Sequence, residues 1–220
     1  MLFRSLASTS EVYGKSTKLP FAEGDDLVMG PSSNCRWGYA CSKAIDEFLA
    51  LAYFREKKLP VTVLRFFNTA GPRQTGRYGM VLPNFVQQAL AGEPVTVYGT
   101  GDQARCFGHV ADVIEGVIAC VSEPSTRGEV FNLGNPEEIS INDLAKRVIR
   151  MTGSSSPIVH IPYGEAYGPG FEDMERRVPD ISKAAKFFSF RPTRKLEEII
   201  DSVIAHERQK GAKTAQLTPR

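Results

Sequence analysis

Apolar side chains follow two different periods along the first third of the chain. Residues 39–58 place them at i, i+4 steps, which is the period of one helical face, and Pro60 ends that pattern. Residues 61–67 are mostly apolar and rich in β-branched side chains, as in a strand buried on both faces. Residues 2–13 are expected to form a short strand that runs into a Ser/Thr-rich turn. The order strand, helix, strand predicts a parallel α/β sheet.

Later segments repeat the two periods over shorter lengths. Helical spacing is expected over residues 82–90, 110–121, 141–151, 181–188 and 196–208. β-rich segments occur at residues 95–98, 130–133 and 158–161. Residues 163–177 contain several Gly and are expected to be irregular, and the polar residues 209–220 are expected to fray.

Composition narrows the class of protein. The chain has 220 residues, 42% of them hydrophobic, which is enough for the core of one or two domains. A net charge of +2 without blocks of like charge gives no reason to expect nucleic acid. No apolar run reaches the ~18 residues of a transmembrane helix, and we expect neither a signal peptide nor a membrane partner. Four cysteines without CxxC spacing favour a reduced, cytoplasmic chain, and no His/Cys/Asp cluster predicts a metal.

Two segments carry candidate chemistry. Residues 8–14 (STSEVYG) end the first strand, and Tyr39 and Lys43 have YxxxK spacing at the start of the long helix. This spacing puts both side chains on one helical face, where the ammonium lowers the phenol pKa so that Tyr can act as a base. With a hydroxyl on a nearby strand end, the set suits oxidation of an alcohol by hydride transfer to a nicotinamide. Because Tyr53 and Lys57 repeat the spacing, an ordinary amphipathic pair is the alternative for Tyr39.

Further motifs follow in a fixed order. They are residues 65–73 (RFFNTAGPR), 82–85 (LPNF), 97–105 (VYGTGDQAR), 131–135 (FNLGN) and 170–180 (GFEDMERRVPD). Together with the two segments above, they resemble the extended short-chain dehydrogenase/reductase family, in its nucleotide-sugar epimerases, 4,6-dehydratases and glucuronate decarboxylases. The resemblance covers nearly all residues from 6 to 205. It implies part of a Rossmann-type parallel sheet and a smaller C-terminal α/β substrate-binding domain.

The resemblance implies roles for the candidate residues. Tyr39 would be the base, and Lys43 would bind the cofactor ribose and tune Tyr39. Thr9 would hydrogen-bond the sugar 4-hydroxyl, and Phe66 would lie at the cofactor. In the family, NAD takes the hydride from C4 and is regenerated within one turnover. The 4-keto sugar is the shared intermediate.

Neighbouring residues indicate what happens to that intermediate. Similar 4,6-dehydratases have Asp where Ser10 stands, whereas similar glucuronate decarboxylases share the Thr-Ser-Glu order that ends at Glu11. Many 4-epimerases have a smaller residue at that last position, and a local cap or ion pair is the alternative for Glu11. Arg177 resembles the arginine that decarboxylases place near the sugar carboxylate, and arginines of this region bind nucleotide phosphates in epimerases. UDP-glucuronate decarboxylation is the preferred reaction, 4-epimerization of UDP-glucose or UDP-glucuronate is second, and a non-catalytic sugar-nucleotide-binding fragment is third.

The resemblance also implies a site for a UDP-sugar. Asn68 would contact the sugar diphosphate, and Arg105 would pair with a phosphate, whose oxygens suit the fork of a guanidinium. Leu82 and Phe85 would line the base pocket and Tyr98 would pack near the base, with core packing as the alternative for the two aromatic rings. The other residues assigned to substrate binding are Ser10, Asp173 and Arg177.

The glycines depart from the family pattern. The family's nucleotide-binding glycine motif lies in its first strand-turn-helix unit, and none of the 19 glycines here forms a GxGxxG or GxxGxxG turn. We therefore expect an N-terminally truncated version that binds NAD poorly, with little turnover, and for which the family's homodimer is in doubt. Residues 1–75 would be the C-terminal part of the NAD-binding domain, 76–210 the nucleotide-sugar lobe with some elements returning to the Rossmann part, and 211–220 a flexible tail.

Overall fold

Three parallel strands form the largest sheet of the computed structural model, which describes residues 4–76, 80–167 and 172–217 (side chains to residue 212). Their order is β1-β2-β7, and they are Arg4–Thr9, Val61–Phe66 and Val130–Leu133. The register places Thr9 beside Phe66, and Phe66 beside Leu133. The predicted α/β class with a parallel sheet is confirmed, and β2 is its central strand.

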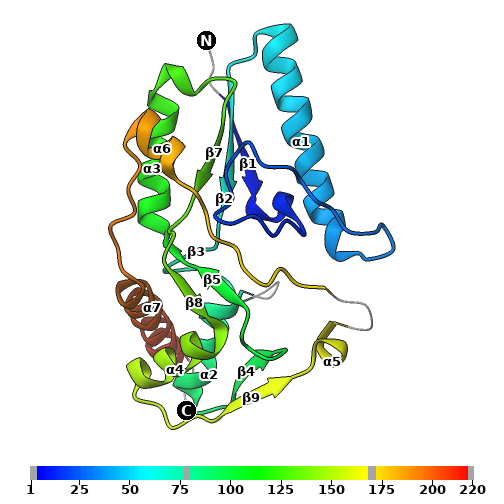
Figure 1. Cartoon of the computed structure of the whole chain (residues 1–220). Coiled ribbons are helices and arrows are strands. Elements are labelled where there is room, and N and C mark those ends of the chain that lie inside the picture. Colours follow the sequence, from blue (N-terminus) through cyan, green and yellow to red (C-terminus); the bar gives the residue numbers. More distant parts are fainter. Residues whose placement is uncertain (1–3, 77–79, 168–171, 218–220) are drawn as a thin grey trace.

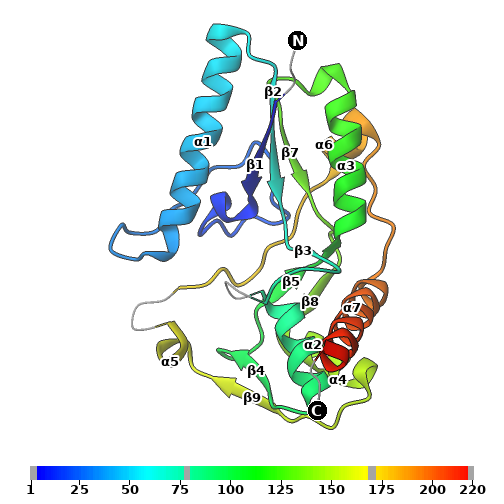
Figure 2. The ribbon, with the colours of Figure 1, turned by 180° about the vertical axis from the view of Figure 1, so that it is seen from behind.

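Helices cover both faces of this sheet (Figures 1 and 2). On one face lies α1 (Arg36–Lys57), and on the other lie α3 (Val110–Ser122) and α6 (Ser182–Phe188). Successive side chains of a strand point to opposite faces, so Arg65 of β2 meets Glu47 of α1. The preceding Leu64 packs with Cys120 of α3. Cover on both faces explains why the sequence of β2 is mostly apolar.

The second part of the molecule is built around three helices: α2 (Val81–Ala91), α4 (Ile141–Thr152) and α7 (Leu196–Leu217). Their core contains the fully buried Leu144, Ile199 and Ile200. Short strand pairs connect the helices: β3 (Thr69–Ala70) with β6 (Gly108–His109), β4 (Val95–Tyr98) with β9 (Ile158–Ile161), and β5 (Ala104–Cys106) with β8 (Glu138–Ser140). The first two pairs are parallel and the third is antiparallel.

A tight turn fixes the end of β1. Residues Ser10–Tyr13 form one 3₁₀ turn, and Gly14 follows with φ of +60°. A Cβ added at Gly14 would lie 2.1 Å from the carbonyl oxygen of Val28, so only glycine fits there. Tyr13 is fully buried and stacks on Phe21 with 4.6 Å between ring centroids. The turn therefore holds Thr9 at the carboxyl edge of the sheet.

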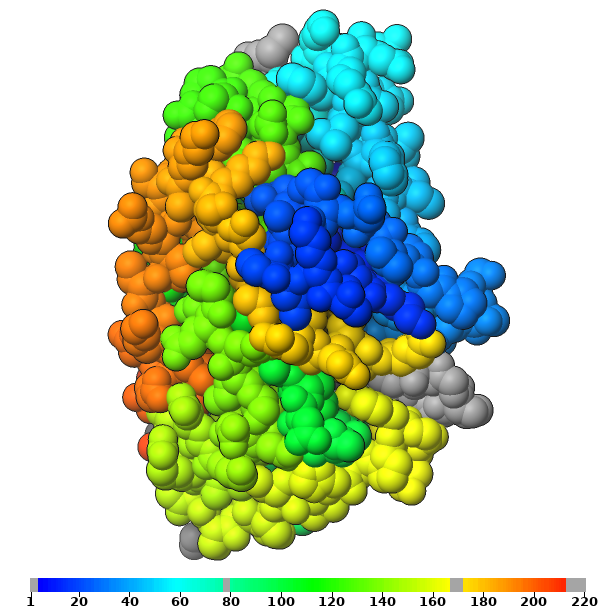
Figure 3. All heavy atoms as spheres, in the orientation of Figure 1, coloured from blue at the N-terminus to red at the C-terminus, as the bar shows by residue number. Residues whose placement is uncertain are grey.

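The segment of residues 172–181 crosses between the two parts (Figure 3). The amide of Phe21 donates to the carbonyl of Val178 across 2.8 Å, and the amide of Ala104 donates to the carbonyl of Glu175 across 2.9 Å. One backbone stretch is thereby tied to both parts of the molecule.

Several boundaries differ from the predicted ones. The helix α1 begins three residues earlier than expected, at Arg36, because the side chain of Asn34 accepts the Arg36 N–H and the following Trp37 is buried. The helix α7 extends nine residues past residue 208, through a polar segment in which Lys, Ala and Gln favour a helix. A short helix, α5 (Tyr163–Tyr167), lies in the stretch expected to be irregular, of which residues 168–171 fall outside the described chain.

Candidate active site

A cavity of about 1090 Å³ follows the carboxyl ends of β1 and β2 into the part built by α2, β4 and α3. This volume is at the upper end of the roughly 300–1,000 Å³ that ligand pockets occupy. All thirteen residues that the sequence assigned to a site line it: Thr9, Ser10, Glu11, Tyr39, Lys43, Phe66, Asn68, Leu82, Phe85, Tyr98, Arg105, Asp173 and Arg177. Their roles stay predictions, but the fold brings them together.

Thr9 and Phe66 stand side by side where β1 and β2 end. This edge of a parallel α/β sheet is where such folds bind ligands. The Oγ1 atom of Thr9 accepts the N–H of Glu11 at 3.3 Å, and a hydroxyl that accepts one bond can still donate its own proton. Thr9 can therefore hold a substrate oxygen.

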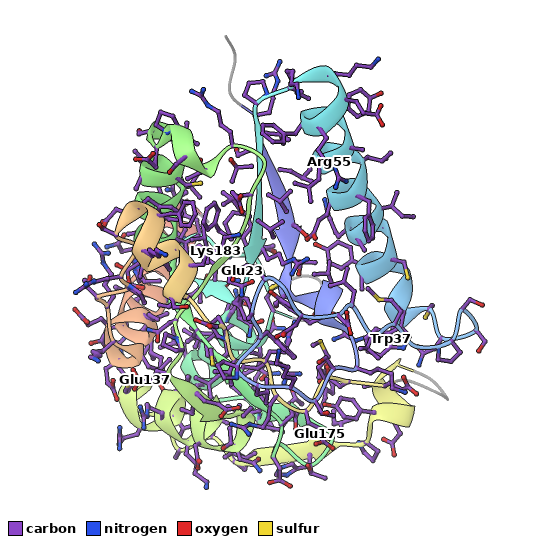
Figure 4. All side chains as sticks on the ribbon, turned by 45° about the horizontal axis from the view of Figure 1, so that its top comes forward. Glu23, Trp37, Arg55, Glu137, Glu175 and Lys183 are labelled. Atoms are coloured by element: carbon purple, nitrogen blue, oxygen red, sulfur yellow. The ribbon has the colours of Figure 1, made fainter. Side chains whose placement is uncertain are left out.

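Tyr39 and Lys43 lie one turn apart on α1, and both line the cavity. The Nζ atom of Lys43 lies 3.3 Å from Asp46 Oδ2, so a carboxylate on the next turn steadies it. The second YxxxK pair, Tyr53 and Lys57, is not among the residues that line this cavity. Tyr53 lies near the exposed end of the helix that Arg55 marks in Figure 4, whereas Trp37 marks the end near the cavity.

Three guanidinium groups and two carboxylates alternate along one wall, in the order Arg177, Glu11, Arg36, Asp173, Arg105; we call this set the charge chain. Arg177 Nη1 donates to Glu11 Oε1, and Glu11 Oε2 lies 3.0 Å from Arg36 Nη2. The same Nη2 lies 3.1 Å from Asp173 Oδ1, and Arg105 Nη2 donates to Asp173 Oδ2 across 2.6 Å. The charge chain carries a net charge of +1, so it favours an anionic ligand.

The two ends of the charge chain are held differently. Arg105 Nη1 donates to the carbonyls of Ala104 at 2.8 Å and Glu175 at 3.2 Å. Burial, reinforced by the charge of Arg177, lowers the pKa of Arg105 to about 10, so this group stays protonated at neutral pH. Arg177 Nη2 donates to Asn68 Oδ1 at 3.2 Å, whereas its buried Nε has no hydrogen-bond partner among the described residues. A buried donor of this kind fits an acceptor atom of a ligand.

The far end of the cavity is mainly apolar. Leu82 and Phe85 of α2 line it and also belong to the core around α2, α4 and α7. Tyr98, at the end of β4, is 37% exposed and lies outside that core. Phe85 therefore packs in this core and also lines the cavity.

Arg36 and Tyr163 are among the cavity residues that the sequence prediction did not assign. Arg36 precedes Tyr39 by three residues on the same helix, and Tyr163 donates its hydroxyl to Asp173 Oδ2 at 3.1 Å. The helical period would have predicted Arg36 if the helix had been started at its true first residue. Tyr163 lies in a segment without a clear period, so no comparable signal marks it.

Other polar groups have structural explanations. The Nδ1 atom of His109 accepts the N–H of Ala111 and caps α3. Burial raises the pKa of the Cys106 thiol to about 12, which leaves it in the unreactive form. Among the described residues, no group of three or more potential ligands is placed to hold a metal. No helix in the described part of the chain is long and apolar enough to cross a membrane.

Comparison with known families agrees with this geometry. The family model described as GDP-mannose 4,6 dehydratase matches residues 4–203. The chain belongs to the GDP-mannose 4,6-dehydratase family. The resemblance read from the ordered motifs is thus confirmed.

Proteins similar to this chain are named for reactions on several nucleotide sugars. The UDP-N-acetyl-alpha-D-glucosaminuronate decarboxylase of Bacillus cytotoxicus is 43% identical over 199 residues, which are 90% of this chain and 61% of that protein. UDP-glucuronic acid decarboxylase 1 of Xenopus tropicalis is 37% identical over 93% of this chain and 46% of its own length. The UDP-glucuronic acid 4-epimerase of Bacillus cereus, solved with UDP-glucuronic acid and NAD, has a TM-score of 0.79 and 29% identity over 94% of this chain and 61% of that one.

This member of the GDP-mannose 4,6-dehydratase family thus spans about half to three fifths of the length of those relatives. Its described residues contain the strand ends, the Tyr39 helix and the charge chain. The question of function is therefore which reaction these groups suit.

Proposed function

We propose that this chain acts in the NAD-dependent decarboxylation of a UDP-linked hexuronate. Two relatives named as decarboxylases of such sugars support the class. The observation that carries the proposal is the Arg177–Glu11 pair, which lies in the same cavity as Thr9 and Tyr39. A guanidinium at that place can hold a sugar carboxylate, and Ser10 stands where a dehydratase would need an acid.

The UDP part of the substrate would extend toward the apolar end of the cavity. Arg105 and Asn68 would face the diphosphate, since a buried guanidinium binds phosphate oxygens with directed hydrogen bonds. Leu82, Phe85 and Tyr98 would surround the base. The net charge of +1 on the charge chain supports binding of such a ligand, because both the diphosphate and the sugar carboxylate are anionic.

The residues at the strand ends fit the nicotinamide end of NAD. Tyr39, Lys43 and Phe66 line the same cavity as Thr9, with Phe66 beside Thr9 in the sheet, and would hold that end. When bound, NAD supplies the hydride acceptor and donor for C4. Tyr39 would take the proton of the 4-hydroxyl, and Thr9 would orient that oxygen by a hydrogen bond. Because the 220 residues contain no GxxGxxG turn, the pyrophosphate has no such cradle in this sequence.

Carbon dioxide would leave from a 4-keto uronate. The bond between C5 and C6 breaks, its electron pair moves toward the C4 carbonyl as an enolate, and C5 then takes a proton from water. The carboxylate is lost as CO2, which leaves a UDP-linked 4-keto pentose when the substrate is UDP-glucuronate. Return of the hydride to C4, with the proton returned to the 4-oxygen by Tyr39, would then give a UDP-pentose. Arg177 would orient the carboxylate for this cleavage, and Glu11 would keep the guanidinium in place.

Two other functions compete with this proposal. UDP-glucuronate 4-epimerization is supported by the 0.79 TM-score to an enzyme of that name. A non-catalytic sugar-nucleotide-binding protein is the candidate of another class, and it would need the cavity but no NAD.

Product analysis tests the proposal. The chain, in excess over substrate, is incubated with saturating NAD and with UDP-glucuronate or UDP-N-acetylglucosaminuronate labelled with ¹³C at C6. We expect labelled CO2, and its loss in Tyr39→Phe but not in the matched Tyr53→Phe variant. A product of unchanged mass supports the epimerase. If neither substrate reacts, and UDP but not NAD protects the chain against heat, the binding protein is supported.

A further inference from the structure

We propose that Arg36 is a specificity residue that recognises the sugar carboxylate together with Arg177. The proposal rests on the function proposed above and adds a residue that no sequence motif assigned. Its basis is the position of Arg36 on α1 and its place in the middle of the charge chain.

The helix period places Arg36 on the face that carries the candidate base. Arg36, Tyr39 and Lys43 follow one another at i, i+3 and i+7, and all three line the cavity. Three residues of helix rise about 4.5 Å, so the Arg36 backbone stands one turn before that of Tyr39. If Tyr39 meets the 4-hydroxyl, a group one turn away on the same face can reach a substituent on the neighbouring carbon of the sugar. In a hexuronate, C5 carries the carboxylate.

Arg36, in the middle of the charge chain, contacts both carboxylates, whereas Arg177 and Arg105 each contact one of them. Each carboxylate that Arg36 touches has a second guanidinium partner: Arg177 for Glu11, and Arg105 for Asp173. Asp173 also accepts the hydroxyl of Tyr163. If Arg36 turns toward a ligand, neither carboxylate is left buried without a cation. Removing either outer arginine leaves one carboxylate with Arg36 as its remaining arginine.

Solvent exposure also distinguishes Arg36 from the two outer arginines. The side chain of Arg36 is 20% exposed, compared with 11% for Arg177 and 7% for Arg105. Arg105 is further fixed by its two bonds to backbone carbonyls. Arg36 is therefore the arginine of the charge chain that can change partner at least loss, and an anionic group of the substrate is the partner that the surplus charge favours.

Two ligands, UDP-glucuronate and UDP-glucose, separate recognition of the carboxylate from recognition of the rest of the nucleotide sugar. UDP-glucuronate and UDP-glucose differ only at C6, so the ratio of their dissociation constants measures recognition of the carboxylate. We expect Arg36→Gln to lower the preference for UDP-glucuronate by about tenfold, as for a hydrogen-bonded charge pair, with UDP-glucose affinity nearly unchanged. Arg36→Lys should keep part of the preference because it keeps the charge. Arg55→Gln, at the exposed far end of the same helix, is the matched control and should bind both ligands like the parent chain.

The outcomes separate this proposal from the proposed function. Calorimetric titration gives the two affinities, and thermal melting of each variant reports its folding. If the parent chain prefers UDP-glucuronate and a folded Arg36→Gln variant shows the same preference, the role of Arg36 is wrong while the proposed function stands. An equal loss for both ligands also overturns it, because that pattern indicates the diphosphate. If the parent chain binds neither ligand, the proposed function is wrong, and so is the proposed role of Arg36 in carboxylate recognition. Should Arg36→Gln not fold, the ratio in Arg36→Lys decides by the same criterion.

Discussion

Two groups of buried charges involve the end of β1 and the turn after it, and they differ in the ratio of cations to anions. Glu47 of α1 accepts hydrogen bonds from Nε and Nη2 of Arg65 at 3.0 and 2.7 Å and another from the hydroxyl of Ser8. This pair has one cation for one anion, and both side chains are 5% exposed. The charge chain instead has three cations for two anions and faces a cavity.

The difference separates a structural charge cluster from a candidate binding site. The Glu47–Arg65 pair connects the helix that carries Tyr39 to the strands that carry Thr9 and Phe66, and every charge in it is matched within the protein. The charge chain contains one more guanidinium than carboxylates, and the buried Nε of Arg177 has no hydrogen-bond partner among the described residues. Substitutions in the first group should therefore reduce stability, and substitutions in the second should reduce binding.

The largest expected effect comes from Glu47→Ala. It leaves the Arg65 guanidinium buried without its counter-ion, which typically costs about 3–5 kcal/mol of the free energy of unfolding. Urea denaturation followed by circular dichroism measures this loss. Glu56→Ala on an exposed position of the same helix is the control and should change stability by less than about 0.5 kcal/mol. Equal effects of the two substitutions would contradict a structural role of the pair.

Arg177→Gln should have a smaller effect, and on binding. Glu11 keeps Arg36 as a partner, so folding should be affected less than in Glu47→Ala. We expect the affinity for UDP-glucuronate to fall by roughly 10- to 100-fold, about 1.5–3 kcal/mol, with little change for UDP-glucose. The neighbouring Arg176→Gln removes an exposed arginine that pairs with Glu138, and it should bind both ligands normally. Equal losses for both ligands in Arg177→Gln would place this arginine at the phosphates.

The smallest effect concerns Glu23, whose backbone carbonyl accepts a hydrogen bond from Nη1 of Arg65 in the Glu47–Arg65 pair. Desolvation raises the pKa of this carboxyl, so the folded state holds the proton over a pH interval in which the unfolded state has released it. The contribution of Glu23 is therefore present at low pH and is lost as pH rises through the raised pKa. Glu23→Gln keeps the oxygen that accepts the Asn132 amide, and it should raise stability at pH 7 by up to about 1 kcal/mol but not at pH 4.

Thermal melting at the two pH values measures the change. Glu137→Gln, on an exposed carboxylate that Figure 4 also labels, should show no such difference between pH 4 and pH 7. A Glu23→Gln variant that is less stable than the parent at pH 7 would show that the charge at this position is satisfied by its surroundings.

The thirteen residues assigned from the sequence share one cavity because their motifs follow strand ends. Residues 8–14 and 65–73 sit after two parallel strands, and such ends share one edge of a sheet, so Thr9 and Asn68 meet in one cavity. Arg36 was missed because the helix start was placed at Tyr39, which removed the preceding turn from the helical face. The Glu47–Arg65 pair was also missed, although a charge inside the apolar run of β2 is unusual enough to require a buried partner.

The short strand pairs are the main part of the fold that the sequence did not predict. The strands β5 and β8 have three residues each, too few for any alternation of apolar and polar side chains to appear. Their pairing is set by tertiary contacts, such as the donation from the Ala104 amide to the Glu175 carbonyl in the crossing segment. Longer elements, such as α1 and β2, were predicted with the correct type because their period extends over the whole element.

We propose that the surplus charge of the cavity wall recognises a nucleotide-linked uronate. Calorimetric titration of the 220-residue chain with UDP-glucuronate and with UDP-glucose tests it most directly. We expect UDP-glucuronate to bind about tenfold or more tightly than UDP-glucose, because one carboxylate meets the surplus guanidinium charge. Equal affinities, or tighter binding of UDP-glucose, would contradict it.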